Sequence, residues 1–401
     1  MPVAATDWRD SARELRFRRR QVSSNVLVQH ARAEAGLLPT GREGFAKPLR
    51  PATCRHAAGA AVGVVGNDLG EQAKFTGLIH CGSVWSCPVC SAVIRARRSD
   101  EVTQACDWWE HERGGSLLFV TFTLRHQLGD SLQRGLDAVT KAFRSVIMGA
   151  PWKRFAARHG IRHQIKAVEV TRGENGWHPH LHVLWFIDAP LSDVARAEAR
   201  AWLSERWQRF VVKHGGRLPS DERGVDLRDV QGGRLVAAYI AKVQEHDRAQ
   251  PRTFGIGPEM TRLDLKRGRQ ESLTPFELLD WDGLDEEERA ERAALWVEWV
   301  ETTRGRRALT FSRGLKEAAG IDDLDDEQLA EADECLDDEI TVTHVTISRR
   351  EWRRIQNDPG KLCRVLELAE AGQWDRIAEV VPCCGPPRSG TPRQWADRAA
   401  A

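Results

Sequence analysis

The chain has 401 residues, of which 41% are hydrophobic and 29% are charged, and its net charge is +1. This composition is ordinary for a globular protein with room for two or three domains, and no run of about eighteen apolar residues is present to cross a bilayer. The N-terminal stretch has basic residues but no apolar core, so it is not expected to be a secretory signal, and we expect a cytoplasmic protein with no membrane partner.

Charge is distributed unevenly along the chain. Residues 1–105 and 106–250 carry net charges of +6 and +5, whereas residues 251–401 carry −10. A basic first half is typical of a protein that meets a polyanion through its N-terminal domains.

Residues 8–33 are predicted to form a basic helix, whose arginines at 16, 18, 19 and 20 suit contacts with DNA phosphates. A solvated helix face or a partly disordered arm explains them equally well. The Gly-, Pro- and Ala-rich residues 34–52 are predicted to be a linker.

Four of the nine cysteines are Cys54, Cys81, Cys87 and Cys90. An odd total and a Cys-Pro-Val-Cys pair favour metal binding in a reducing compartment over a disulfide framework. Four thiolates are the ligands that tetrahedral zinc prefers, so we expect a structural zinc here, although His56 or His80 could replace one cysteine. Free structural cysteines and a redox pair are the alternatives. The helix that follows is expected to run to about residue 112.

Basic residues follow the last of these cysteines directly. They are Arg95, Arg97 and Arg98, at the start of that helix. We expect them to hold DNA phosphates, although a solvated helix face explains them nearly as well.

The middle of the chain is predicted to alternate strands and helices. Residues 117–125 and 224–230 are predicted to be strands, and residues 131–148 and 192–213 helices with apolar side chains at helical spacing. Between them, residues 165–188 are predicted to form a β-hairpin around a Gly-Glu-Asn-Gly turn. This order indicates an α+β fold with a central antiparallel sheet and flanking helices.

The second strand of this hairpin carries three histidines, His178, His180 and His182. Alternate residues of a strand share a face, so His180 and His182 lie roughly 7 Å apart along the strand and can chelate one ion. If residue 172 pairs with 179, Glu169 faces His182 and adds a carboxylate, but a slip of one residue turns it away. The carboxylate favours Mg²⁺ or Mn²⁺, while the imidazoles also accept softer metals.

Tyr239 is the only tyrosine of the chain, where ordinary usage would give about a dozen. It lies in a predicted helix, residues 233–246, with Lys242 and His246 on the same face. A phenol with a cation one turn away is the arrangement that a tyrosine nucleophile needs, because Lys242 stabilises the phenolate and the attacked phosphate. Taken alone, Tyr239 is also explained as a core residue.

Taken together, these features resemble the HUH endonucleases, and within them the plasmid rolling-circle replication initiator (Rep) proteins of actinobacterial type. The resemblance covers roughly residues 54–315. It rests on the cysteine knuckle, VTFTL at 120–124, the Pro-His-Leu-His-Val-Leu segment, and Tyr239-Ile-Ala-Lys242. LTPFELLD at 273–280 and GRRALTFSRGL at 305–315 are also similar to the C-terminal segments of such members.

The resemblance implies that His180 and His182 are the metal ligands, Glu169 the third ligand and Tyr239 the nucleophile. His178 and His246 are less favoured as ligands. It further implies nicking of plasmid origin DNA, single-stranded or in an extruded hairpin, with a 5′-phosphotyrosine link and a free 3′-hydroxyl primer, and work with a host helicase and polymerase. Some relatives carry a carboxylate one turn before the tyrosine. Leu235 stands there in this chain, and Glu245 is a possible substitute.

The sequence therefore predicts five segments. They are a basic arm and linker at 1–52, a zinc-binding knuckle at 53–105, an HUH endonuclease domain of ferredoxin-like type at 106–250, a helical C-terminal extension at 251–320, and an acidic helical tail region at 321–401. An HUH transposase or relaxase is the alternative with the same chemistry. A non-catalytic, zinc-containing DNA-binding regulator is the alternative of another class.

Overall fold

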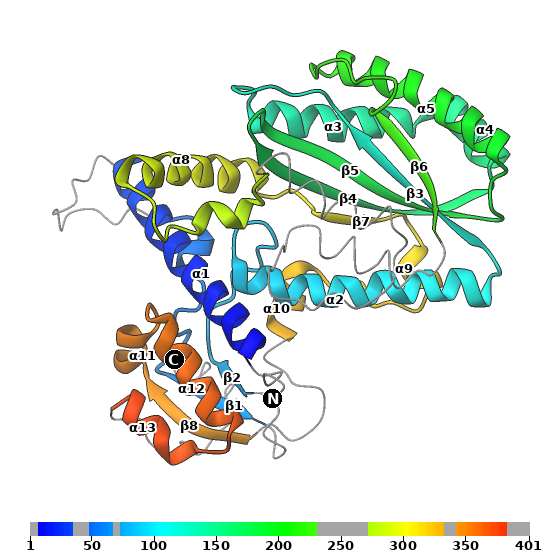
Figure 1. Ribbon diagram of the computed structural model, residues 1–401. Coiled ribbons are helices and arrows are strands. Elements are labelled where there is room, and N and C mark those ends of the chain that lie inside the picture. Colours follow the sequence, from blue (N-terminus) through cyan, green and yellow to red (C-terminus); the bar gives the residue numbers. More distant parts are fainter. Residues whose placement is uncertain (1–6, 35–47, 67–72, 231–271, 333–341, 383–401) are drawn as a thin grey trace, which may run out of the picture. The chain divides into compact units, whose positions relative to one another are not determined.

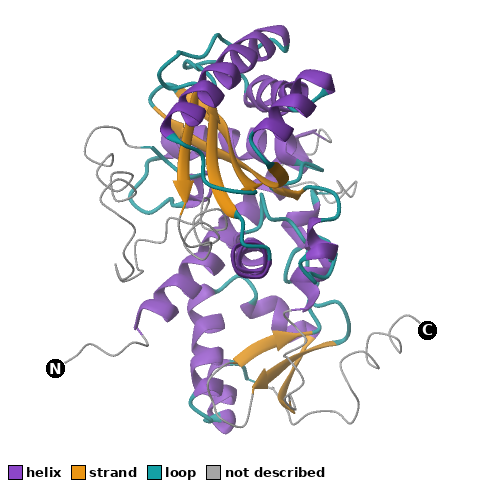
Figure 2. Ribbon diagram, turned by 90° about the vertical axis from the view of Figure 1, so that its right-hand side faces the viewer, coloured by secondary structure: helices purple, strands orange, loops and turns teal. Residues whose placement is uncertain are grey.

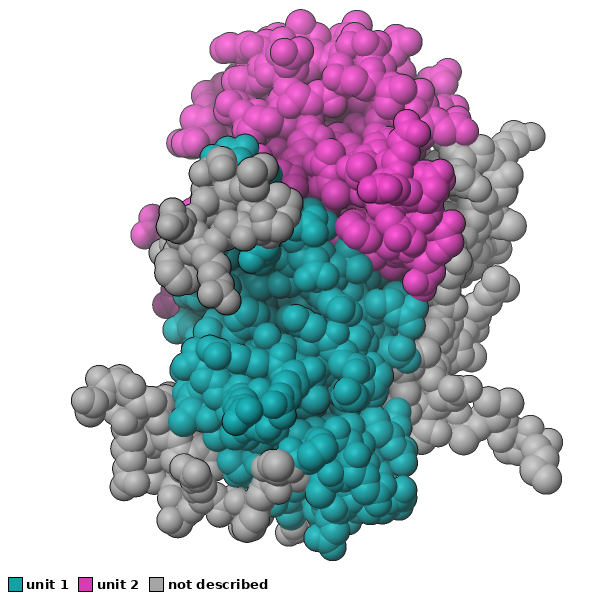
Figure 3. Space-filling view, turned by 90° about the vertical axis from the view of Figure 1, so that its left-hand side faces the viewer, with its two compact units in different colours: residues 1–94, 247–251, 324–401 teal, residues 95–246, 252–323 magenta. Residues whose placement is uncertain are grey.

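The computed structural model describes residues 7–34, 48–66, 73–230, 272–332 and 342–382 (Figure 1). The described residues fall into two compact units, which Figure 3 colours separately. Residues up to Ile94 and from Leu324 onward form the first, which we call the cysteine unit, and residues Arg95–Asp323 form the second, the histidine unit. Helix α2 (Pro88–Asp107) contains the boundary.

The histidine unit is built on a five-stranded antiparallel sheet of order β6-β3-β5-β4-β7 (Figure 2). Its strands are β3 (Ser116–Thr123), β4 (Ile161–Gly173), β5 (Gly176–Ile187), β6 (Val225–Val230) and β7 (Leu309–Phe311). Its helical elements are η2 (Trp108–Glu112), α3 (Leu132–Val146), α4 (Gly149–Arg158), α5 (Asp193–Lys213), η4 (Pro275–Leu279), α8 (Glu286–Thr303) and α9 (Leu315–Ala318).

Both faces of this sheet are covered, and the alternation of each strand decides which side chains go where. In Figure 1, α3, α4 and α5 lie over one face. On that face Phe122 packs against Phe143 of α3 and Trp207 of α5. The other face contributes Ile165 and Leu184 to a core with the α2 residues from Val102 onward. The central strand β5 is therefore buried at nearly every position, which explains its almost continuous apolar sequence.

Helix boundaries in this unit follow capping chemistry. Ser192 caps α5 by accepting a hydrogen bond from the Ala195 amide. Asp285 and Glu288 form a reciprocal capping box at the start of α8, whose Trp296 and Trp299 are fully buried. These caps fix where the helices begin, so the apolar stripe of each helix meets the core in register.

The cysteine unit contains a smaller antiparallel sheet of order β2-β1-β8. Its strands are β1 (Ala61–Gly66), β2 (Ala73–Thr76) and β8 (Val342–Ser348), and its helical elements are α1 (Asp7–Glu34), η1 (Arg50–Thr53), α10 (Asp326–Ala332), α11 (Arg349–Ile355), α12 (Pro359–Glu370), η5 (Trp374–Arg376) and α13 (Ile377–Val380). Strand β8 pairs with β1 from Ala61↔Ser348 to Gly66↔Val342. Phe17 of α1, Val64 of β1 and Leu366 of α12 share one core.

The α+β class and the antiparallel sheet predicted from sequence are confirmed. The predicted segment boundaries differ from the observed division, because β8 joins β1 and brings residues from 324 onward into the same unit as the cysteines. The helix predicted to run to about residue 112 consists of α2, which ends at Asp107, and the π-helical turn η2, which ends at Glu112. Helix α4 was not predicted. Among the described helices, none has the length and apolar character that a bilayer crossing demands.

Candidate functional site

The β4–β5 hairpin brings Glu169, His180 and His182 together on one face of the sheet. Glu169 lies directly opposite His180, and Ala167 lies opposite His182. The strands are joined by a two-residue turn between Gly173 and Gly176, the latter at φ 83°, a backbone conformation that favours glycine.

The register predicted from sequence was wrong by two residues. Residue 172 pairs with Trp177 and not with 179. The shift arises because the turn is tighter than assumed. A shift of two preserves the face of every side chain, so Glu169 still joins the histidines.

One carboxylate oxygen of Glu169 is the centre of this group. Its Oε2 lies 2.7 Å from Nε2 of His180 and 2.6 Å from Nε2 of His182. One ligand atom from each of the three residues lies within 4.8 Å of the others. Two imidazole nitrogens and one carboxylate oxygen form a donor set that divalent ions accept, so the residues fit the metal site that the sequence predicts.

The partners of the other ring nitrogens strengthen this fit. Nδ1 of His180 lies 3.2 Å from the His178 carbonyl, which can only accept, so Nδ1 carries the proton. Nε2 of a neutral His180 then presents a lone pair to a carboxylate oxygen, and two lone pairs at this distance repel unless a cation lies between them. A proton or a metal ion fills that role. Nδ1 of His182 similarly lies 3.2 Å from Oγ1 of Thr121, a residue that the sequence reasoning missed.

Electrostatics at the site are those of a carboxylate held by two imidazoles. Burial raises the pKa of Glu169, but the charges and hydrogen bonds of His180 and His182 outweigh it, and the pKa lies far below its usual value. Burial lowers the pKa of His180, but Glu169 outweighs it and the net shift is upward. For His182, burial dominates and the pKa falls. Glu169 is thus held ionised, as a metal ligand must be.

His178 is not part of this three-residue group. Its ring stacks on His126 at 4.4 Å between centroids, and its backbone carbonyl orients His180. The ring of Phe119 stacks on His182 at 5.2 Å. Tyr239, Lys242 and His246, together with Leu235 and Glu245, lie outside the described residues, and their predicted roles stay predictions.

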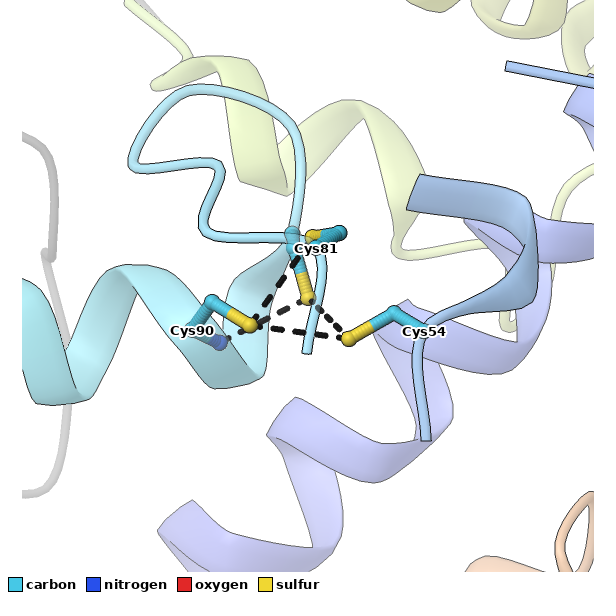
Figure 4. A group of neighbouring side chains, drawn as sticks. Cys54, Cys81 and Cys90 are labelled. Carbon is cyan, nitrogen blue, oxygen red and sulfur yellow. Dashed lines mark hydrogen bonds between the residues drawn. The ribbon is translucent and has the colours of Figure 1, made fainter. Parts of the chain in front are cut away.

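The four predicted zinc ligands form a second group, in the cysteine unit. Figure 4 labels three of them, Cys54, Cys81 and Cys90. The sulfur of Cys54 lies 3.5 Å from those of Cys87 and Cys90, and the sulfur of Cys81 lies 3.8 Å from that of Cys90. Sulfurs at about 2.3 Å from one tetrahedral zinc are about 3.8 Å apart, so these residues fit zinc. His56 and His80 are not members of the group.

Backbone pairing explains how distant cysteines meet. Ala57 bridges Leu78, and the amides of Arg55 and Ile79 donate to the carbonyls of Ile79 and His56. These contacts lay the segment that follows Cys54 beside the segment that precedes Cys81. Cys87 directly precedes α2, and Cys90 lies in its first turn. Hydrogen bonds with Cys54, Cys81 and Cys87 hold the pKa of Cys90 well below the usual value of a thiol, although burial opposes them.

Arg20 stabilises the backbone next to the cysteine group. Its side chain is 2% exposed and donates to the Cys54 carbonyl, the Gln356 carbonyl and Oδ1 of Asn357. Burial lowers the pKa of Arg20, whereas Cys54 and Cys87 raise it. A phosphate contact or a solvated face, the roles weighed from sequence, therefore does not describe this arginine. Its role was hidden because its partners are distant in sequence.

The three arginines after the cysteines have different environments. Arg95 is 7% exposed, and Arg98 donates to Glu101 at 2.8 Å. Arg97 is half-buried. Binding of DNA by these residues remains a prediction, and Arg97 is the one of the three that is neither fully buried nor held by Glu101.

An antiparallel sheet that presents two imidazoles and a carboxylate, in a chain that also holds a four-cysteine group, defines an α+β protein with two candidate metal sites. Residues 74–207, which include three of the cysteines and all of the Glu169 group, match a family model described as "Replication protein". Over this segment the chain is similar to that replication-protein family.

Two curated relatives are similar to this chain. "Protein rep" of Streptomyces lividans is 33% identical over 310 residues, covering 63% of this chain and 66% of that protein. "Neomycin resistance protein" of Streptomyces cyanogenus is 39% identical over 155 residues, 32% of each. This chain thus spans just under two thirds of the first relative and about a third of the second. No solved structure matches.

Proposed function

We propose that this protein initiates plasmid replication by nicking one strand of origin DNA through a tyrosine transesterification of the HUH type. Glu169, His180 and His182 hold a divalent ion, Mg²⁺ or Mn²⁺, and Tyr239 is the nucleophile. The observation that carries the proposal is the convergence of these three ligand atoms within a replication-protein domain. In such a domain, paired histidines on a central strand can hold the divalent ion that acts on a scissile phosphate.

A divalent ion bound there supplies Lewis-acid stabilisation of the charge on the scissile phosphate. The phenolic oxygen of Tyr239 attacks phosphorus and forms a 5′-phosphotyrosine bond. The bond from phosphorus to the 3′-oxygen breaks, and that oxygen takes up a proton to become the primer hydroxyl. Lys242 stabilises negative charge on the phenolate and on the attacked phosphate. The ester bond is conserved, so the nick needs no nucleotide cofactor and is reversible.

The remaining parts of the proposal concern DNA and partners. The four cysteines hold a structural zinc that orders the segment before the catalytic sheet. Arg97, with Arg95 and Arg98, contributes positive charge near the phosphates of the origin, whether single-stranded or extruded as a hairpin. The freed 3′-hydroxyl is extended by a host polymerase, and a host helicase opens the duplex ahead of it.

Cleavage of labelled single-stranded origin DNA tests this function. The protein is incubated with Mn²⁺ and the products are separated under denaturing conditions. We expect a protein–DNA adduct with the wild-type chain and none with Tyr239→Phe or with His180→Ala. A Tyr239→Phe variant that forms as much adduct contradicts the nucleophile. Binding of the DNA with no adduct from any form supports the regulator instead.

A further inference from the structure

A cavity in the histidine unit lies on the face of the sheet that carries α3. Its volume is about 380 Å³, within the range of small-molecule sites. Strand β4 contributes Gln164 and Lys166 to its wall. Lys166 is three residues from Glu169, and side chains at odd spacing on a strand point to opposite faces. The cavity is therefore separated from the Glu169 group by the thickness of the sheet.

Lys166 is the central feature of this cavity. It is half-buried, and among the described residues its ammonium has no ion pair or hydrogen bond. The ammonium lies 5.9 Å from the centroid of the Phe143 ring. Burial alone lowers its pKa, with no carboxylate to raise it. A desolvated cation without an anion is unfavourable, and a bound anion would relieve that cost.

The amide of Gln164 also presents donors to the cavity. Its Oε1 accepts from Nε1 of Trp185 at 3.2 Å, and an indole nitrogen can only donate. This contact fixes the orientation of the amide, and its NH₂ group, which has no hydrogen-bond partner among the described residues, is left for a ligand.

The facing wall adds charge of the same sign. Helix α3 supplies Arg144, which is exposed, and Lys141, which forms an ion pair with Asp137 at 3.1 Å. Strand β7 supplies Thr310, directly opposite Lys166 in the ladder. No Asp or Glu is among the described residues that line the cavity. Three cations with an amide donor and no carboxylate form a wall suited to an anion with several acceptor oxygens.

We propose that this cavity binds a phosphate ester, with Lys166, Arg144 and the Gln164 amide as its donors. Phosphate offers the charged acceptor oxygens that these donors need, and the cavity is larger than a bare anion requires, which favours an ester. The same chemistry comes from two sources, a free nucleotide or the backbone of a nucleic-acid strand. The inference goes beyond the proposed nicking reaction, and its test is made without divalent ions so that the two can fail separately.

Binding to the full chain in EDTA tests the site. One arm titrates deoxyadenosine 5′-monophosphate by calorimetry, and the other titrates a short single-stranded oligonucleotide without terminal phosphates by fluorescence anisotropy. The variants are Lys166→Met, which keeps the unbranched apolar stem and removes the ammonium, and Arg144→Gln, an exposed position that leaves the core untouched. Lys153→Met on α4, an exposed lysine outside the cavity, makes the same change in charge.

We expect Lys166→Met and Arg144→Gln each to weaken binding roughly tenfold, the size of one lost charge-assisted hydrogen bond, and Lys153→Met to leave it unchanged. Loss in the nucleotide arm identifies a free nucleotide as the ligand, and loss in the oligonucleotide arm alone identifies the backbone. If neither probe binds, or if Lys153→Met weakens binding as much as Lys166→Met and Arg144→Gln do, the inference is overturned.

Discussion

Glu169 and His180 lie directly opposite each other on β4 and β5, with Oε2 of the glutamate 2.7 Å from Nε2 of the histidine. His182 approaches the same oxygen from the next position on that face. A single carboxylate oxygen thus contacts two imidazole nitrogens, which makes Glu169 the residue on which metal affinity is expected to depend.

Substitution Glu169→Gln should therefore weaken Mn²⁺ binding roughly 100-fold, because a charged ligand is replaced by a neutral amide. Isothermal titration of Mn²⁺ into the protein measures this. Glu174→Gln, in the exposed turn of the same hairpin, makes the same charge change and should leave the affinity unaltered. Equal affinity of wild type and Glu169→Gln would remove Glu169 from the ligand set.

Thr121 is expected to act as a positioning residue for His182. Thr121→Val removes the hydroxyl that lies 3.2 Å from Nδ1 and should lower Mn²⁺ affinity roughly tenfold, with little change in melting temperature. Thr103→Val, where the hydroxyl donates to a helix carbonyl, is the matched control. A similar loss of affinity in both variants would indicate a general structural effect.

Zinc content should depend on the four cysteines of the cysteine unit and on no other buried thiol. Cys81→Ser should reduce the metal content from about one zinc per chain to none and lower the melting temperature, because the site loses one of four ligands. Cys106→Ser, a buried cysteine outside the group, should retain the zinc. Elemental analysis after dialysis distinguishes the two, and zinc retained by Cys81→Ser would refute the assignment.

Arg20 should be worth more to stability than its neighbours on α1. Arg20→Met leaves the carbonyls of Cys54 and Gln356 without their donor and should cost about 2–4 kcal/mol in the free energy of unfolding. Arg18→Met, which removes an exposed pair with Glu14, should cost at most about 0.5 kcal/mol. Urea unfolding of the zinc-loaded protein compares them, and equal costs would exclude the supporting role of Arg20.

Local patterns predicted the site better than they predicted its surroundings. The alternation of β4 and β5 was sufficient to place Glu169 with His180 and His182, and the short turn changed only the register. Thr121 was within reach of such reasoning, because it alternates onto the same face of β3 and pairs with His182. The turn length, which depends on backbone geometry, was not.

Contacts between distant segments carried no local signal. The pairing of β8 with β1 and the hydrogen bonds of Arg20 to Cys54 and Asn357 join segments far apart in sequence. A strand that completes a sheet looks the same in sequence whichever partner it takes. The cysteines were grouped correctly because their side-chain chemistry is specific, whereas Lys166 could be assigned to a strand but not to a cavity.

Peptide mapping of the protein–DNA adduct by mass spectrometry is the most direct test of the proposed chemistry. The protein is incubated with Mn²⁺ and origin oligonucleotide and then digested with nuclease and protease. A nucleotide joined through its 5′-phosphate should be found on the peptide that contains Tyr239. The yield of this peptide should fall to background in His182→Ala or in EDTA. A nucleotide on any other residue, or an undiminished yield on Tyr239 in His182→Ala, would contradict a nick made by Tyr239 at the Glu169–His180–His182 site.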